Sequence, residues 1–285
     1  MNINIKLNTF KKKHKLKKNQ IIFHKANCQS YKAVENLINK FLNKKNSFIF
    51  ESVEKRRVRG RYTIIGADPD KIWDFEKNKI KLTEKNKTKI IKESPYLFLR
   101  KLIENFSFPL PKNIPSICSL LVGYFSYDII RYIEKIPNKC IDDLKIPDIR
   151  MLRPRTVIIY DNLLKKIYFI KNCFADEKIY NYKKFFLYQF NDIKNIKELA
   201  FSTSYKKNPK KIKIIKSSVK SNISKNKFKE IVLKAKKYIK KGDIFQVVLS
   251  QRFETKLTKT PLEIYKKLRV SNPSPFMFFF NFNDF

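Results

Sequence analysis

The chain has 285 residues, 43% of them hydrophobic, and carries 64 lysine and arginine residues against 25 acidic residues, a net charge of +39. This length and hydrophobic content suffice for about two domains with a sizeable core. With four glycines, two histidines and cysteines that lack C-x-x-C spacing, the sequence excludes a glycine-rich phosphate loop and a zinc site of the usual type.

The strong positive charge has two explanations. The lysines are spread along the whole chain, and Lys, Asn, Ile and Phe, which all have AT-rich codons, are frequent. This pattern indicates coding bias, and we expect no sequence-specific nucleic-acid partner. The alternative is a basic nucleic-acid-binding protein whose cations neutralise phosphates.

Membrane and secretory segments are not expected. The longest apolar run, from Ile117 to Ile130, contains Ser119, Ser126 and Asp128, and is too short and too polar to cross a bilayer. The N-terminal residues are charged without an apolar stretch. The four cysteines show no paired spacing, which is typical of reduced thiols. We therefore expect a cytoplasmic location and no membrane partner.

The first two thirds of the chain predict one domain. Residues 1–19, with five basic residues at 11–15, predict a basic tail that is flexible or forms an edge segment, followed by an N-terminal regulatory domain at residues 20–200. Helical spacing of apolar residues predicts helices at 31–42 and 96–106. Short apolar runs bounded by polar residues predict strands, at residues 47–51, 61–66, 71–75, 79–82, 119–125, 156–160 and 167–170, with a turn at 67–70.

These elements lack the regular alternation of parallel α/β folds, so the sequence predicts an α+β fold with mixed, largely antiparallel sheets and packed helices. Residues 201–222 predict a linker to a second domain at 223–285. There we expect an amphipathic helix at 224–241 with inward-facing apolar residues, ended by Gly242 in the left-handed conformation, and a strand at 244–253. A capping box at Thr260–Glu263 opens a helix to about residue 270, and a strand follows within 278–285.

Two polar or rigid segments could bind a small ligand. Glu51 and Ser52 end an apolar strand, where an acid and a hydroxyl could receive an ammonium group and a further hydrogen bond. The prolines of Asn272–Met277 fix an extended corner, with Phe276 and Met277 as an apolar wall. The alternative is that both are ordinary polar or loop junctions at strand ends.

Three windows of the sequence resemble anthranilate synthase component I: residues 235–254, residues 51–70 and the corner 272–277. The resemblance implies that the acid, the hydroxyl and the corner bind L-tryptophan, the feedback inhibitor, through Glu51, Ser52, Pro275, Phe276 and Met277. Arg61 is a weaker candidate. The resemblance also makes residues 223–285 the start of a truncated chorismate-binding catalytic domain.

Gln246 lies in the window 235–254. Related isochorismate-forming enzymes have a lysine at the matching position, and a glutamine there resembles the ammonia-using branch of the family. The resemblance therefore implies an active-site neighbour that orients the nucleophile. The alternative is a strand residue that faces solvent.

The resemblance implies a reaction and its partners. A component I converts chorismate and ammonia to anthranilate and pyruvate, with magnesium, and receives ammonia from a glutamine amidotransferase subunit, component II. The family's magnesium-binding glutamates and catalytic histidine have no counterpart in these 285 residues, so we expect an inactive N-terminal fragment. Aminodeoxychorismate synthase component I and a non-catalytic basic ligand- or nucleic-acid-binding remnant remain as alternatives.

Overall fold

The computed structural model describes residues 1–52, 60–77, 79–139, 141–203, 218–282 and 284–285. The chain divides into two compact units, the first formed by residues 1–206 with 268–285 and the second by residues 207–267. Residues 268–285, which we expected in the second domain, belong to the first unit because their strand pairs with a strand near the N-terminus.

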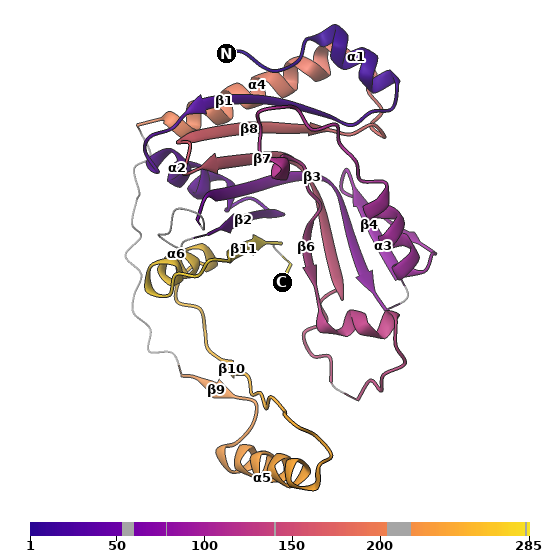
Figure 1. The fold of residues 1–285 in the computed structure, drawn as a ribbon, viewed down its shortest axis with the longest axis vertical. Coiled ribbons are helices and arrows are strands. Elements are labelled where there is room, and N and C mark those ends of the chain that lie inside the picture. Colours follow the sequence, from indigo (N-terminus) through magenta and orange to yellow (C-terminus); the bar gives the residue numbers. More distant parts are fainter. Residues whose placement is uncertain (53–59, 78, 140, 204–217, 283) are drawn as a thin grey trace. The chain divides into compact units, whose positions relative to one another are not determined.

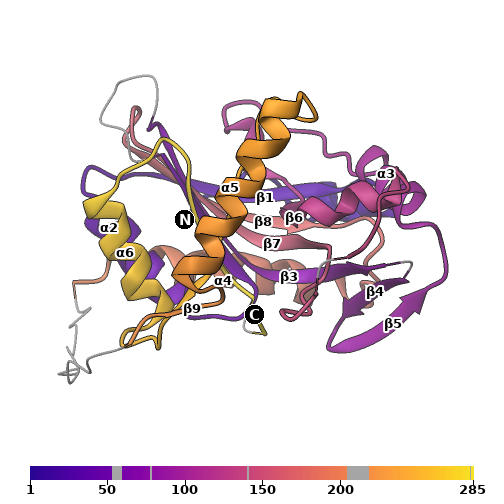
Figure 2. The ribbon, with the colours of Figure 1, turned by 90° about the horizontal axis from the view of Figure 1, so that it is seen from below.

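The first unit is built on one antiparallel sheet with the strand order β1-β8-β7-β3-β2-β11 (Figures 1 and 2). This architecture confirms the predicted α+β class. The main strands are β1 Gln20–Asn27, β2 Ser47–Glu51, β3 Tyr62–Glu76, β7 Ile149–Asp161, β8 Lys166–Cys173 and β11 Met277–Asn281. Three further strands extend the sheet: β4 Lys79–Glu84 pairs with β3, β5 Lys87–Ile91 pairs with β4, and β6 Val122–Phe125 pairs with β7.

Strand β3 corrects the expectation of a turn at residues 67–70. It continues through this segment, and its pairing with β7 shifts register between Pro69 and Lys71. Asp68 has a φ of 52°. An irregularity of this kind inserts residues into one strand without reversing the chain, and it tolerates a proline that has no N–H to donate.

Three helices cover one face of this sheet: α1 Leu7–Lys15, α2 Lys32–Phe41 and α4 Tyr182–Phe201. Helix α1 replaces the expected flexible tail. Its Phe10 is fully buried and stacks 5.9 Å from the Phe185 ring of α4. Between α2 and α4, the buried Asn36 amide donates to the Ala200 and Ser202 carbonyls. The buried Phe10 ring thus packs the lysine-rich helix α1 against α4, and the hydrogen bonds of Asn36 join α2 to the end of α4.

Three further helices of the first unit pack on two apolar clusters of the sheet: α3 Pro95–Glu104 and η2 Tyr127–Tyr132 on the cluster of Trp73 and Phe75, and η1 Ser116–Cys118 on that of Val157 and Ile159. In a separate cluster, Phe48 and Leu152 are fully buried against Phe282. Close packing makes two glycines necessary. A Cβ on Gly66 would lie 2.1 Å from the Phe48 ring, and a Cβ on Gly123 would lie 1.7 Å from the Arg150 carbonyl oxygen.

A buried ion cluster ties the last residues of the chain to the sheet. The Arg150 side chain, 8% exposed, donates to both carboxylate oxygens of Asp74 at 2.5 and 2.7 Å. It also donates to Asp284, whose side chain is 56% exposed. Burial alone would lower the pKa of Arg150, but the two carboxylates outweigh it and raise the pKa. Arg150 therefore stays charged and needs its partners.

The second unit contains α5 Lys225–Lys241, capped by Ser224 and ended by Gly242 at a φ of 77°, as the sequence predicts. The expected strand at 244–253 is wrong: only Phe253–Glu254 (β10) pairs, with Lys220–Ser221 (β9). A strand forms by pairing its backbone, and the other residues of this segment have no strand beside them in the described ranges. The expected inward face of α5 is confirmed in part: Ala235 is buried and Phe228, Ile231 and Val232 are half-buried, whereas Tyr238 and Ile239 are exposed.

Helix α6, Pro261–Ser271, begins at the predicted capping box. The Thr260 N–H donates to the Glu263 carboxylate, and the Glu263 N–H donates to the Thr260 hydroxyl. These two bonds satisfy backbone donors that the first turn leaves without helical partners. The hydrogen bonds from Thr260 hold the pKa of Glu263 below its usual range.

Candidate functional site

A cavity of about 600 Å³ lies in the first unit where β2 and β3 meet β11. The ladder places Glu51, the last residue of β2, opposite Met277 on one side and opposite Thr63 on the other. Segments far apart in the sequence therefore supply its walls, which are Phe50, Glu51, Ser52, Gly60, Arg61, Tyr62, Ile64, Pro275, Phe276, Met277 and Phe278.

The cavity has an aromatic and aliphatic wall that follows from strand alternation. Phe50 pairs with Phe278 of β11 and with Ile64 of β3, so the three side chains share one face of the sheet. All three line the cavity together with Tyr62. A wall of this composition suits the apolar body of a planar ligand.

Arg61 supplies positive charge at the cavity and is held in place by Asp161. Its Nε and Nη2 donate to the Asp161 carboxylate, the latter at 2.8 Å, and the Asp161 side chain is 1% exposed. Burial favours the neutral acid, but the bonds from Arg61 and from the Leu163 and Leu164 amides hold the pKa of Asp161 below its usual range. The guanidinium is thus fixed, and its own pKa is raised by the same carboxylate.

Glu51 lies at the cavity, but its carboxylate is engaged elsewhere. Strand alternation places its side chain on the face opposite Phe50. There the Tyr31 hydroxyl donates to Oε1, and Arg269 Nε lies 3.3 Å from Oε2. Because this carboxylate is 2% exposed and already neutralised, Glu51 offers the cavity its backbone at the end of β2.

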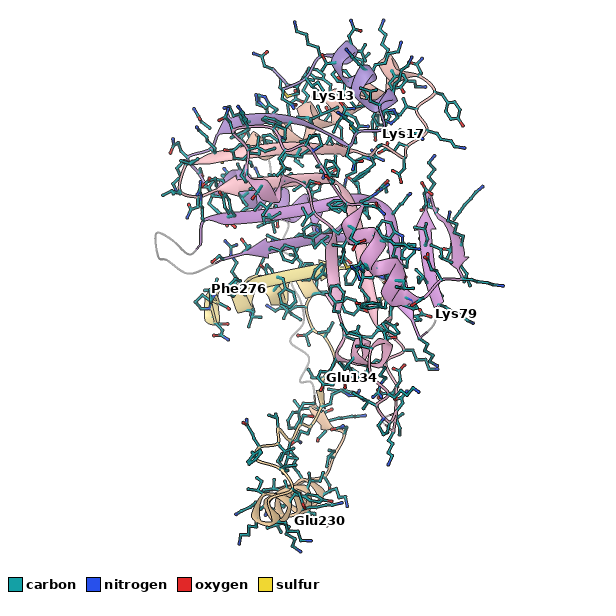
Figure 3. The ribbon with its side chains drawn as sticks, turned by 45° about the vertical axis from the view of Figure 1, so that its right-hand side comes forward. Lys13, Lys17, Lys79, Glu134, Glu230 and Phe276 are labelled. Atoms are coloured by element: carbon teal, nitrogen blue, oxygen red, sulfur yellow. The ribbon has the colours of Figure 1, made fainter. Side chains whose placement is uncertain are left out.

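The corner 272–276 forms the other side of the cavity. The Ser274 hydroxyl accepts from the Phe276 N–H at 3.3 Å and fixes a short turn. Phe276 is 87% exposed at the start of β11 (Figure 3), whereas Met277 is 7% exposed. The corner therefore presents one open aromatic ring and one buried thioether.

The structure brings together all five residues that the resemblance assigned to the amino-acid site. Arg61, the weaker candidate, also lines the cavity. Gln246, by contrast, is exposed in the second unit and belongs to no described cavity. Phe50, Tyr62, Ile64 and Phe278 were missed. The alternation of β2 could have shown Phe50, but the partners on β3 and β11 depend on a register that the sequence does not reveal.

The donor set of the described residues does not suit a metal ion. In the described ranges, the His, Cys, Asp and Glu side chains form no group of three or more suited to a metal, so these residues do not fit magnesium and no reaction step is assigned to it. Over the same part of the chain, the helices all fall short of the length and apolarity that a bilayer crossing requires.

Comparison with known proteins identifies the class. A family model described as chorismate binding enzyme matches residues 45–285. The chain therefore belongs to the chorismate binding enzyme family. Within that family it is similar to anthranilate synthase component I, as its three sequence windows predicted.

Three relatives show the extent of this similarity. Anthranilate synthase component 1 of Acetivibrio thermocellus is 36% identical over 247 residues, covering 84% of this chain and 49% of the relative. The Cereibacter sphaeroides protein of that name is 29% identical over 282 residues, covering 97% and 56%. Anthranilate synthase alpha subunit 1, chloroplastic, of Arabidopsis thaliana is 34% identical over 254 residues, covering 81% and 42%.

The fold is also found among solved structures. The crystal structure of anthranilate synthase component I from Streptococcus pneumoniae TIGR4 matches with a TM-score of 0.62 at 24% identity, covering 75% of this chain and 46% of that one. The chain spans about half the length of the curated relatives that it matches.

Proposed function

We propose that this chain provides the amino-acid-binding, regulatory part of an anthranilate synthase component I and that its cavity binds L-tryptophan. The observation that supports the proposal is the convergence of Ser52, Arg61 and residues 275–277 of the corner on one cavity. A ligand held between β2 and a segment that follows the second unit in the chain could favour one arrangement of the protein over another.

The chemistry of the cavity suits an aromatic amino acid. The volume of about 600 Å³ lies in the range of small-molecule sites. We place the indole against Phe50, Ile64 and Phe278, which share one face of the sheet, and the carboxylate toward Arg61 and the Ser52 hydroxyl. The ammonium would then meet backbone carbonyls at the end of β2, since the Glu51 carboxylate faces Tyr31 and Arg269.

Ser52→Ala should weaken L-tryptophan binding by about tenfold, because the loss of one hydrogen bond to a charged group costs roughly 1.5–3 kcal/mol. Met277→Thr should weaken binding by a similar factor, since a shorter, polar side chain disturbs the buried packing that holds the corner beside the end of β2. Isothermal titration calorimetry on the purified chain measures both effects. In a complete enzyme with this sequence, the same variants should shift the tryptophan inhibition curve and leave chorismate turnover nearly unchanged.

Ser94→Ala is the matched control, because Ser94 is exposed and its side chain caps no helix. Its affinity for L-tryptophan should equal that of the wild type. An unshifted titration for Ser52→Ala, or turnover that falls in parallel with inhibition in the complete enzyme, would contradict the assignment of this site.

For the whole protein we propose the reaction of the relatives: chorismate and ammonia are converted to anthranilate and pyruvate, with magnesium and with a glutamine amidotransferase subunit as the ammonia source. The resemblance assigns the magnesium ligands and the catalytic histidine to positions that these 285 residues do not contain. This assignment supports a regulatory and structural contribution of the present residues.

The purified 285-residue chain should accordingly produce no anthranilate from chorismate, ammonium and magnesium. Anthranilate fluorescence measures the product, with a complete component I from Acetivibrio thermocellus as positive control. Fluorescence that increases with the concentration of the 285-residue chain would show that the chemistry was assigned to the wrong residues.

A further inference from the structure

Tyr31, Glu51 and Arg269 form a closed cluster behind the cavity, which we name the Glu51 clamp. The Tyr31 hydroxyl donates to one oxygen of the carboxylate, and Arg269 pairs with the other at 3.3 Å. The Arg269 guanidinium also lies over the Tyr31 ring, 4.8 Å from its centroid. Each member thus contacts the other two, which gives a geometry more constrained than a single ion pair.

The clamp joins three segments of the first unit, which for α6 contains only the end of the helix from residue 268. Tyr31 stands at the N-terminus of α2, Glu51 ends β2, and Arg269 lies in the last turn of α6. The Tyr31 ring is itself held edge-on against Tyr160 of β7, with centroids 5.8 Å apart. The end of α6 is therefore fixed to the sheet through side chains that are mostly buried.

Glu51 holds both ends of the corner that lines the cavity. Its carboxylate binds Arg269, before the corner, and its backbone pairs with Met277, after the corner. The intervening residues 270–276 include Pro275 and Phe276 of the cavity wall. A loop closed on one residue at both ends loses conformational freedom before any ligand arrives.

We propose that Arg269 and Tyr31 are positioning residues for the amino-acid site: through the Glu51 carboxylate they hold the corner 270–276 in its ligand-binding geometry without contacting the ligand. This inference rests on the proposed function of the cavity. It also assigns the Glu51 carboxylate a positioning role instead of the ammonium contact that its residue type suggests.

The protonation states of Tyr31 and Arg269 keep the clamp formed at physiological pH. Burial raises the pKa of Tyr31, and the neighbouring Glu51 carboxylate raises it further, so the hydroxyl keeps the proton that it donates. Arginine is charged at every physiological pH. The buried carboxylate thus has a neutral donor and a cation beside it, and removal of Arg269 alone would leave its charge poorly compensated.

The first test is backbone hydrogen exchange on the ligand-free protein, compared between wild type and the double variant Glu51→Gln/Arg269→Gln. The double change removes both charges and so avoids an unpaired buried carboxylate that could prevent folding. We expect the exchange rates of the backbone amides at residues 272–278 to rise at least tenfold, while the exchange rates in β7 and β8 stay unchanged. Equal exchange at 272–278, or a rise spread over β7 and β8, would overturn the proposal.

The second test uses two ligands that differ by the ammonium group, L-tryptophan and indole-3-propionate. A positioning role predicts that the double variant loses affinity for both ligands by the same factor, about tenfold or more. A loss confined to L-tryptophan would show that the Glu51 carboxylate contacts the ammonium, and would overturn the proposal. Tyr31→Phe, which removes one hydroxyl and keeps the ring, should weaken both ligands equally by a smaller factor.

Arg100→Gln is the matched control, since Arg100 is 65% exposed in an i,i+4 pair with Glu104. This variant should change neither exchange at 272–278 nor either affinity. A wild-type chain that binds neither ligand would defeat the proposed function of the cavity, whereas the exchange measurement would still decide whether the clamp orders the corner.

Discussion

Gly123→Ala should lower the free energy of unfolding by about 3 kcal/mol or more, at the upper end for an overpacking substitution. The new methyl group would stand 1.7 Å from the Arg150 carbonyl oxygen, and the next nearest atoms also belong to the β7 backbone. Backbone within a ladder cannot rotate away as a side chain can. Relief therefore requires β6 to separate from β7. Urea denaturation followed by tryptophan fluorescence measures the loss, because Trp73 is buried beside this region.

Gly66→Ala is the comparison variant within the same sheet. Its methyl group would meet the Phe48 ring at 2.1 Å, a side chain that can move when space is available. The cost should be smaller, about 1–3 kcal/mol, and Phe48→Leu in the same molecule should recover part of it. Equal stability of Gly123→Ala and the wild type would mean that β6 and β7 lie farther apart than described.

Asp74→Ala should cost about 3–5 kcal/mol, because it removes one partner of a buried ion pair and leaves Arg150 charged in the sheet. Arg150 is 8% exposed and makes two hydrogen bonds to Asp74, while its remaining carboxylate partner is largely solvated. The midpoint of urea denaturation at neutral pH measures the effect. The comparison requires that the dependence of the unfolding free energy on urea concentration, the m-value, is the same in both proteins.

Asp284→Ala provides the matched control on the same arginine. The Asp284 side chain is 56% exposed, and an ion pair with this much contact with water contributes about 1 kcal/mol or less. Equal losses for the two aspartates would show that burial does not distinguish these partners, and would contradict the buried character of the Asp74 pair.

Local sequence patterns predict the helices and strands that neighbouring residues determine, through apolar spacing and capping. The apolar run Ser47–Glu51 is a strand over the predicted residues, and α5 begins at Ser224 and ends at Gly242 as capping rules require. The strands predicted at 156–160 and 167–170 lie within β7 and β8, which a short connection joins and which pair with each other. Family resemblance predicts five residues that line the candidate site: Glu51, Ser52, Pro275, Phe276 and Met277.

Tertiary contacts decided the remainder. The lysines of α1 suggested a flexible tail, but the buried Phe10 makes it a packed helix. The strand expected at 244–253 needed neighbouring strands, and Phe245 there is fully exposed. The engagement of Glu51 by Arg269 joins residues far apart in the chain, and a spacing pattern within one element gives no sign of it.

The pairing of β11 with β2 has a consequence for biosynthesis. The Asn281 amide donates to the Leu42 carbonyl across 239 positions of sequence, and β11 covers the free edge of β2 along its length. At about 5–20 residues per second, the ribosome needs roughly ten to fifty seconds to make the intervening chain. During that time Phe48, Ile49 and Phe50 form an open, apolar strand edge, the kind of template to which other nascent chains adhere. Synthesis of this protein should therefore depend on chaperones that shield strand edges until residue 281 has left the exit tunnel.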